Sequence, residues 1–448
     1  MFHNRSFDRY GFFMPDYQQT IDYLFSRLPM FSRLGAAAFK ADLTNTIILS
    51  EAVGNPHLQF KSIHIAGTNG KGSASHMISA ILQTAGYKTG LYTSPHLKDF
   101  RERIKVNGEM IEEAFVIDFT ERIKPLIEEI EPSFFEITVV MAFAWFALQK
   151  VDIAVVEVGL GGRLDSTNII TPELSVITNI GYDHQNMLGN TLKEIAGEKA
   201  GIIKKGIPVV IGETLPETKQ VFLQKAKEAD APAYFANEKR WVTDWKMEGH
   251  ELVVTVADNH TDERKNYSLD LTGLYQTKNL ITVLEAVHIL IRQGWKIEEK
   301  HIENALSHVK DLTGLYGRWQ VIRQRPFTVL DVGHNEDGIK QIAEQLEFCN
   351  FKKLHVVIGM VKDKDVAKVL SLLPVHASYY FTKAQIPRAL NENELAEKAK
   401  EFNLHGQAFA SVHEALQQAA DRADKEDMIL VCGSVFVVGE VEAENIKW

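Results

Sequence analysis

The chain has 448 residues, of which 45% are hydrophobic and 24% are charged, and its formal net charge is −10. This length exceeds one ordinary hydrophobic core and predicts two or three domains. The acidic balance argues against a nucleic-acid partner, and we see neither a long apolar run nor a charged-then-apolar leader. We therefore expect no membrane span or signal peptide, a cytoplasmic location, and two reduced cysteines, Cys349 and Cys432, in place of a disulfide.

The first predicted elements surround a glycine-rich turn. Helices are expected over 17–28 and 41–53, with no element before Tyr17. A β-branched strand over 62–66 then runs into Gly67-Thr68-Asn69-Gly70-Lys71-Gly72-Ser73 and a helix over 74–82. Strand, glycine turn and helix is the architecture of a phosphate-binding loop, in which backbone N–H groups and the helix N-terminus face the phosphates. The strict P-loop pattern is not met, because Gly72 follows Lys71 where Ser or Thr is required. A simple turn is the alternative.

Polar side chains lie at or just after the carboxyl ends of three later strands, predicted over 89–93, 152–158 and 174–178. They include Ser94, Glu157 and His184. Ligands bind at the carboxyl edge of open α/β sheets, and a buried acid is costly unless it is paired or metal-bound, so Glu157 is a candidate metal ligand. The alternatives are a turn role for Ser94, backbone N–H groups of the following glycines for Glu157, and simple packing for His184.

The remaining elements of the first half are mainly helical. Helices are predicted over 111–129, 134–148 and from 191 to Lys199, a strand over 209–212, and a long helix from 273 to 292. Between 241 and 271 the period switches to two, which indicates an antiparallel hairpin or small sheet. Lys199 could simply complement the helix dipole, and Arg101 and Arg103 could belong to a solvated face.

The second half alternates strand and helix again. Strands are expected over 327–332, 354–358, 379–381 and 428–432, with helices over 339–346, 392–401 and 412–423. This rhythm predicts a smaller Rossmann-like domain. The fold class is therefore α/β: an N-terminal P-loop parallel-sheet ATPase-like domain (1–310) with a small antiparallel subsheet, and a C-terminal Rossmann-like domain (311–448).

Several motifs occur in a characteristic order from about Tyr17 onward. They are the glycine loop 67–73, Thr93-Ser94-Pro95-His96-Leu97, Phe100-Arg101-Glu102-Arg103, Glu157-Val158-Gly159-Leu160-Gly161-Gly162, Asp183-His184, Glu198-Lys199-Ala200-Gly201, Gly317-Arg318 and Asp331-Val332-Gly333-His334-Asn335. In this order they resemble the folylpolyglutamate synthase and dihydrofolate synthase family, which belongs with the Mur ligases. The pattern departs from the family at Tyr275, where His is usual, and at Tyr316, Val332-Gly333 and Glu336.

The resemblance implies a role for each matching position. Gly67, Thr68, Asn69, Gly70, Lys71, Gly72 and Ser73 would hold ATP phosphates, with further contacts from Asn279, Arg318, Asp331 on the ribose side, and His334. Ser94, Glu157 and His184 would bind Mg²⁺, and a carbamylated Lys199 would help to hold a second ion. Phe100, Arg101, Arg103, Phe135 and Glu136 would line the pterin and folate side. Lys71, His184, Lys199 and Arg318 would be catalytic.

The reaction implied is ATP-dependent ligation of L-glutamate to dihydropteroate and to reduced folates through an acyl phosphate. We expect a monomer with both activities. The alternatives are a Mur-type ligase that joins an amino acid to a cell-wall nucleotide, a nucleotide-switched binding protein without turnover, and a P-loop kinase. The departures concern nucleotide and linker contacts, so we expect altered contacts with the same reaction.

Overall fold

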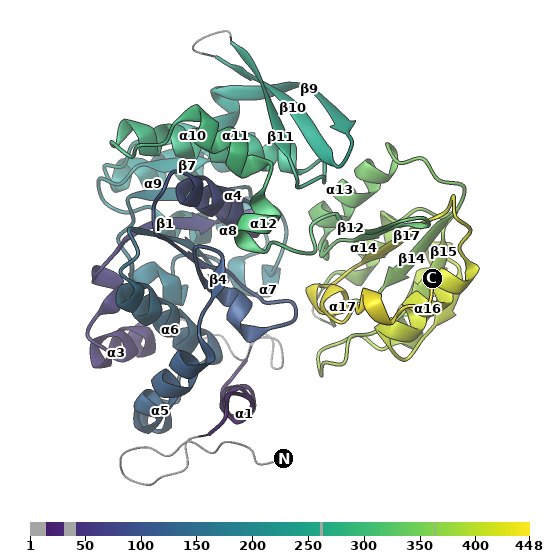
Figure 1. The fold of residues 1–448 in the computed structure, drawn as a ribbon, viewed down its shortest axis with the longest axis horizontal. Coiled ribbons are helices and arrows are strands. Elements are labelled where there is room, and N and C mark those ends of the chain that lie inside the picture. Colours follow the sequence, from purple (N-terminus) through teal and green to yellow (C-terminus); the bar gives the residue numbers. More distant parts are fainter. Residues whose placement is uncertain (1–14, 31–41, 260–262, 363) are drawn as a thin grey trace.

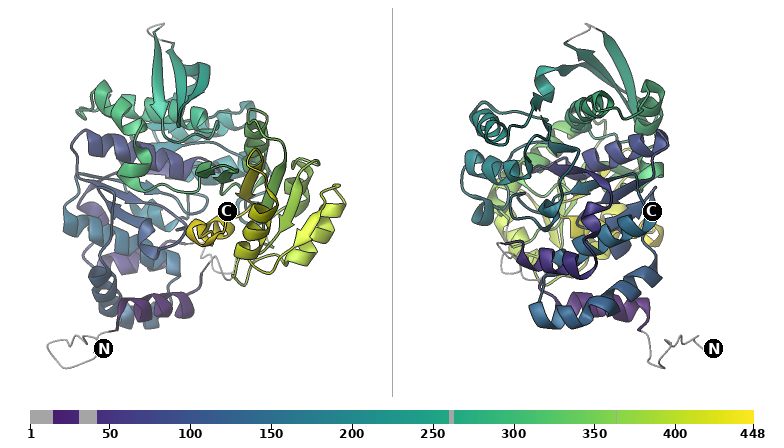
Figure 2. Two further views of the ribbon diagram at one scale, coloured as in Figure 1. Left: turned by 45° about the vertical axis from the view of Figure 1, so that its right-hand side comes forward. Right: turned by 90° about the vertical axis from the view of Figure 1, so that its left-hand side faces the viewer.

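A computed structural model describes residues 15–30, 42–259, 263–362 and 364–448. Two α/β units lie side by side in it, with a small antiparallel sheet projecting from the first (Figures 1 and 2). The first unit contains an eight-stranded sheet of order β4-β3-β2-β5-β1-β6-β7-β8. Its strands are β1 Lys61–Ala66, β2 Thr89–Tyr92, β3 Ile104–Val106, β4 Glu109–Met110, β5 Ile153–Glu157, β6 Leu174–Ile177, β7 Val209–Ile211 and β8 Ala233–Phe235.

Helices cover both faces of this sheet, so its central strands are apolar on both sides. On β5, Ile153 and Val155 join one hydrophobic core, whereas Ala154 and Val156 join the other. The helices are α1 Tyr17–Arg27, α3 Thr44–Ala52, α4 Lys71–Thr84, α5 Glu113–Ile130, α6 Phe134–Gln149, α7 Gln185–Leu188, α8 Leu192–Lys199, α9 Pro216–Glu228, α10 Gln276–Arg292, α11 Glu299–Leu306 and α12 Val309–Thr313. The predicted sheet is confirmed as parallel except for β3 and β4, which pair antiparallel at one edge, and its main helices are confirmed. The part of the helix predicted over 41–53 that includes Ala41 lies outside the described residues.

The period-two region forms a three-stranded antiparallel sheet of order β11-β10-β9. Its strands are β9 Arg240–Glu248, β10 Glu251–Asp258 and β11 Arg264–Leu269. Alternate residues of β10, among them Leu252 and Val254, are buried in the core that also contains α4 and α10. The prediction of a small antiparallel sheet is confirmed.

The second unit has a six-stranded sheet of order β12-β13-β17-β14-β15-β16, parallel except for β12. Its strands are β12 Gln320–Gln324, β13 Phe327–Leu330, β14 Leu354–Ile358, β15 Ser378–Phe381, β16 Gly406–Ala408 and β17 Met428–Cys432. Its helices are α13 Glu336–Leu346, α14 Val366–Ser371, α15 Glu392–Lys400, α16 Val412–Arg422 and α17 Val435–Gly439. The Rossmann-like expectation is confirmed, and both cysteines are free.

A short segment, residues 314–319, joins the two units. The boundary predicted between 310 and 311 falls inside α12, which still packs against α4, and the second sheet begins at Gln320. That boundary stays a prediction. In the described part of the chain, no helix combines the length and apolarity that crossing a membrane requires.

Candidate active site

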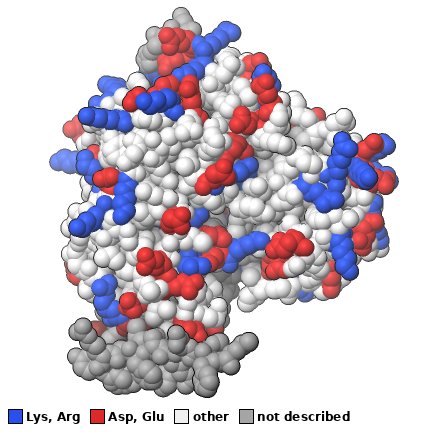
Figure 3. All heavy atoms as spheres, viewed as in Figure 1, with Lys and Arg blue, Asp and Glu red and all other residues white. Residues whose placement is uncertain are grey.

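The carboxyl edges of both sheets border one cavity of about 360 Å³. From the first unit it is lined by segments that follow β1, β2, β5 and β6, and from the second by segments that follow β13, β14 and β17. Basic and acidic side chains are interspersed over the face shown in Figure 3. The predicted site residues in that lining are Gly67, Thr68, Asn69, Gly70, Lys71, Gly72, Ser73, Ser94, Arg103, Phe135, Glu136, Glu157, His184, Lys199, Arg318, Asp331 and His334.

The glycine loop is held against β6 and opens into α4. Thr178 donates its hydroxyl to the Asn69 carbonyl at 2.6 Å, and a side chain at Gly67 would collide with that hydroxyl. Lys71 is the first residue of α4, and its Nζ donates to the carbonyls of Gly67 and Thr68 at 3.1 Å each. The sequence placed Lys71 in the glycine turn before a helix over 74–82, but the helix begins at Lys71 itself, and the side chain is half-buried.

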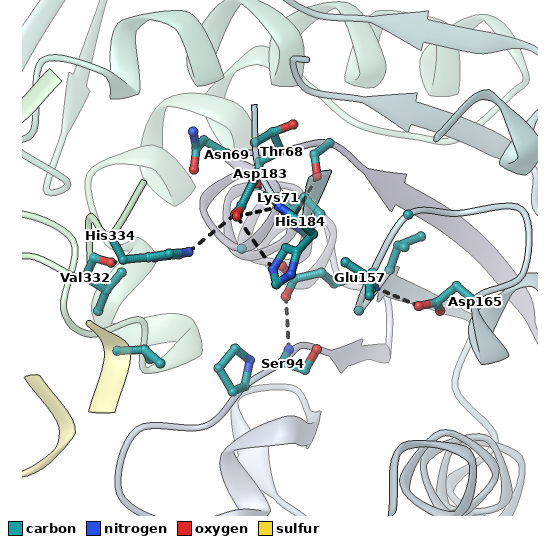
Figure 4. Close-up of a pocket in the computed structure, with 18 of the residues that line it drawn as sticks. Thr68, Asn69, Lys71, Ser94, Glu157, Asp165, Asp183, His184, Val332 and His334 are labelled. Carbon is teal, nitrogen blue, oxygen red and sulfur yellow. Dashed lines mark hydrogen bonds and ion pairs between the residues drawn. The ribbon is translucent and has the colours of Figure 1, made fainter. Parts of the chain in front are cut away.

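The three predicted metal-binding side chains all face the cavity (Figure 4). The backbone N–H of Ser94 donates to Oε2 of Glu157 at 3.1 Å, and Glu157 is 4% exposed. Burial raises the pKa of Glu157, and the charge of Lys71 opposes this rise, so added positive charge would stabilise the carboxylate. Burial lowers the pKa of His184 to about 3, which leaves the neutral imidazole that metals bind.

The N–H of Gly159, one of the partners that the sequence allowed for Glu157, is used elsewhere. The N–H groups of Gly159 and Leu160 point to Asp165, which Thr167 also bonds. Among the described residues, no cluster of three or more His, Cys, Asp or Glu side chains could hold a metal; Ser and Thr hydroxyl groups are not counted in this statement. A cation at Glu157 and His184 would therefore draw on the Ser94 hydroxyl and on oxygen atoms of a bound ligand.

Lys199 lies at the end of α8 but is turned inward. Its side chain is buried, and Nζ donates to the Gly67 carbonyl of the glycine loop at 3.0 Å. Burial and the nearby charge of Lys71 lower the pKa of this amine to about 7. The side chain is thus directed to the glycine loop, in contrast to the helix-capping alternative that the sequence left open.

Asp183 connects the two units at the cavity, as Figure 4 shows for its contact with His334. It forms an ion pair with Lys364, and it lies 3.5 Å from His334 Nε2 and accepts the Asn335 amide at 3.2 Å. Although burial opposes it, the hydrogen bond from His334 and the charge of Lys364 hold the pKa of Asp183 well below its ordinary value. Lys364 was missed by the sequence analysis, although its position after a predicted strand at the ligand edge was a usable signal.

Arg318 reaches from the linker to the start of α4. A methyl carbon placed on Gly72 would lie 3.4 Å from Arg318 Nη2 and 3.8 Å from Glu157 Oε1. Arg318 and Glu157 thus lie beside Gly72, the position of the departure from the strict P-loop pattern, in the first turn of α4.

Phe100 and Arg101 do not lie among the cavity-lining residues. Phe100 is buried among aromatic rings, and Arg101 is engaged by Asp99 and Glu113. Arg103 does face the cavity, where its Nε donates to His96 Nδ1 at 2.8 Å. Glu136 lines the cavity too, but it also caps α6 through the Ser133 N–H. Asn279 lies beside Gly70 in a small adjoining pocket.

Comparisons with known proteins agree with this geometry. Residues 65–287 match the Mur ligase middle domain, and residues 317–435 match the Mur ligase, glutamate ligase domain. The chain is 33% identical over 414 residues to the dihydrofolate synthase/folylpolyglutamate synthase of Bacillus subtilis, covering 88% of this chain and 92% of the relative.

Solved structures extend the likeness to the whole arrangement. Escherichia coli FolC in complex with DHPP and ADP superposes with a TM-score of 0.82 at 28% identity, covering 95% of this chain and 96% of FolC. The bifunctional folylpolyglutamate synthase/dihydrofolate synthase of Yersinia pestis, complexed with AMPPNP and Mn ion, gives 0.81 at 28% identity, covering 96% and 98%. The chain belongs to the folylpolyglutamate synthase/dihydrofolate synthase family of the Mur ligase superfamily.

Proposed function

We propose that this chain is an ATP-dependent ligase that adds L-glutamate to dihydropteroate and to reduced folates. The observation that carries the proposal is the single cavity in which a phosphate loop, a buried carboxylate and cations from both units converge. Membership of the family supports the same reaction.

In the first step, a carboxylate oxygen of the folate precursor attacks the γ-phosphorus of ATP. An O–P bond forms, the bond to ADP breaks, and an acyl phosphate results. Two anions meet in this step, so positive groups with fixed positions lower its barrier. Lys71 and Arg318 are such groups, because both line the cavity beside Glu157.

In the second step, the amine of glutamate attacks the acyl carbon, phosphate leaves, and a proton is released from nitrogen. Two cations from the second unit, Lys364 and Arg388, face the cavity and suit the carboxylates of glutamate. Contacts from Asn335 and Lys364 to Asp183 hold the two units together, which favours exclusion of water from the hydrolysable acyl phosphate.

Ser94, Glu157 and His184 are the residues that would hold Mg²⁺, because they combine hard oxygen donors with a neutral imidazole. Bound there, the ion would offset negative charge on the ATP phosphates. We also propose that Lys199 is carbamylated and contributes to a second ion site. Carbon dioxide adds to a neutral amine with loss of a proton, and the lowered pKa of Lys199 favours that form.

A monomeric state, a cytoplasmic location and the use of both substrates remain predictions. An assay that offers dihydropteroate, tetrahydrofolate and a cell-wall nucleotide precursor side by side tests the proposal. We expect glutamate-dependent ADP release with both pterin substrates, and a product heavier by one glutamyl residue. ADP release with the cell-wall precursor alone would identify a sister Mur ligase instead.

A further inference from the structure

The backbone is left-handed on both sides of Arg318. Gly317 has φ +76°, and Trp319 has φ +46°. A bulky side chain rarely adopts this region, and it persists there only where the surroundings hold it. Trp319 is 2% exposed, so its side chain is fixed in the core of the second unit. The backbone N–H of Trp319 also needs a hydrogen-bond acceptor.

Asp331 accepts that N–H. Its Oδ2 accepts the N–H of Trp319 at 2.8 Å and the hydroxyl of Tyr275 at 2.6 Å, and its Oδ1 accepts the N–H of Gly333 at 2.8 Å. Asp331 is 3% exposed. On the other side of Arg318, the carbonyl of Gly317 accepts the N–H of Val332 at 3.0 Å. Hydrogen bonds therefore hold the backbone at Gly317 and Trp319, the two neighbours of Arg318 in the linker.

We call the hydrogen bond between Tyr275 and Asp331 the clasp. Its two side chains come from different units. Tyr275 directly precedes α10 in the first unit, and Asp331 directly follows β13 in the second. Their hydrogen bond exists only while the two units hold this arrangement. Burial and the adjacent Asp331 raise the pKa of Tyr275 well above its ordinary value, so the hydroxyl keeps the proton that it donates.

We propose that Tyr275 and Asp331 are positioning residues, which fix the left-handed linker at Trp319 and thereby hold Arg318 over the N-terminus of α4. This assigns Asp331 a role beyond the ribose-side contact that the family resemblance implies. The inference rests on the proposed function only in taking Arg318 to contact ATP phosphates.

A double-mutant cycle tests whether Tyr275 acts through Arg318. ATP affinity is measured by calorimetry for the unmodified chain, Tyr275→Phe, Arg318→Ala and the double variant. We expect Tyr275→Phe to weaken ATP binding about tenfold, the effect of losing one hydrogen bond to a charged group. In the Arg318→Ala background the same change should weaken binding less than about twofold. If the two losses of ATP affinity multiply in the double variant, Tyr275 acts independently of Arg318 and the proposal is overturned.

Tyr267→Phe is the matched control, because the Tyr267 hydroxyl also donates to a carboxylate, Glu299, at 3.0 Å but lies on β11 away from the cavity. It should leave ATP affinity unchanged, and an effect equal to that of Tyr275→Phe would contradict a specific clasp. The affinity readout does not depend on turnover. If the unmodified chain binds ATP without glutamate-dependent ADP release, the proposed function fails while the cycle still decides on the clasp.

Discussion

Lys71 differs from a surface lysine because two carbonyls of its own loop accept its ammonium protons. We expect Lys71→Ala to lower kcat by roughly 10²-fold or more, since charge developing on the transferred phosphoryl group loses its partner. The free energy of unfolding should fall by only about 1–3 kcal/mol, the net value of hydrogen bonds from a charged group. Enzyme kinetics and denaturant unfolding measure the two effects.

The control for Lys71 is Lys61→Ala, which removes an exposed lysine paired with Glu173 at the start of β1. It should change neither quantity appreciably. Complete loss of cooperative unfolding in Lys71→Ala would instead show that the lysine is structural.

Substitution of Lys199 tests the proposed carbamate directly. We expect Lys199→Ala to be nearly inactive, and added short carboxylic acids to restore part of the activity by supplying the missing anionic oxygen. Protein equilibrated with ¹³C-labelled bicarbonate should show a carbamate carbon resonance that the variant lacks. Identical spectra from the two proteins would refute carbamylation at this position.

At the scale of elements, the glycine loop depends on its approach to β6. Gly67 has φ +149°, and a Cβ there would lie 1.9 Å from Thr178 Oγ1. Gly67→Ala should therefore displace the loop, weaken ATP binding at least about tenfold and lower the free energy of unfolding by about 1–3 kcal/mol. Gly197→Ala within α8, where a Cβ meets nothing within 4 Å, is the control and should be neutral or slightly stabilising. Unchanged ATP affinity in Gly67→Ala would contradict the loop assignment.

Strand β1 carries a buried histidine that makes the first unit sensitive to acid. His64 is fully buried beside Thr167, and burial lowers its pKa to about 3. The unfolded chain binds this proton near pH 6.5 and the folded chain does not, so stability is full above that pH and declines as pH falls toward 3. His64→Asn should reduce the slope of the unfolding free energy against pH by up to about 1.4 kcal/mol per pH unit in this window.

Denaturant unfolding between pH 7 and pH 4 measures that slope. The exposed His308, which directly precedes α12, provides the control substitution His308→Asn. An acid slope that His64→Asn leaves unchanged would show that His64 is protonated in the folded chain.

Sequence periodicity predicted the elements that bury a continuous apolar face, such as β5 and α6. It did not predict β3 and β4, because Ile104-Lys105-Val106 and Glu109-Met110 give neither a continuous apolar run, as Val209–Ile211 of β7 does, nor a sustained alternation. Glu157 and His184 could be proposed because Glu157 ends a strand and His184 follows one. The inward turn of Lys199 and the position of Arg101 outside the cavity depend on tertiary contacts that no local pattern specifies.

At the scale of the whole molecule, function depends on contacts between units that are distant in sequence. Lys364 reaches Asp183, and Asn335 exchanges hydrogen bonds with the Asn69 side chain. We expect Lys364→Met to lower kcat at least about tenfold, because Asp183 then stays buried without its cation. Small-angle scattering should show a larger radius of gyration, with the unfolding of each unit preserved. An unchanged kcat and radius would show that the pair is dispensable.

The ligase chemistry itself has a signature in the released phosphate. When the carboxylate of dihydropteroate carries ¹⁸O, attack on the γ-phosphorus transfers one of its oxygens to the phosphate that later leaves. Mass analysis of that phosphate, with ATP and L-glutamate supplied, tests the acyl-phosphate route directly. The proposed mechanism predicts one ¹⁸O atom in each phosphate formed together with glutamyl product. Unlabelled phosphate alongside the same product would contradict it.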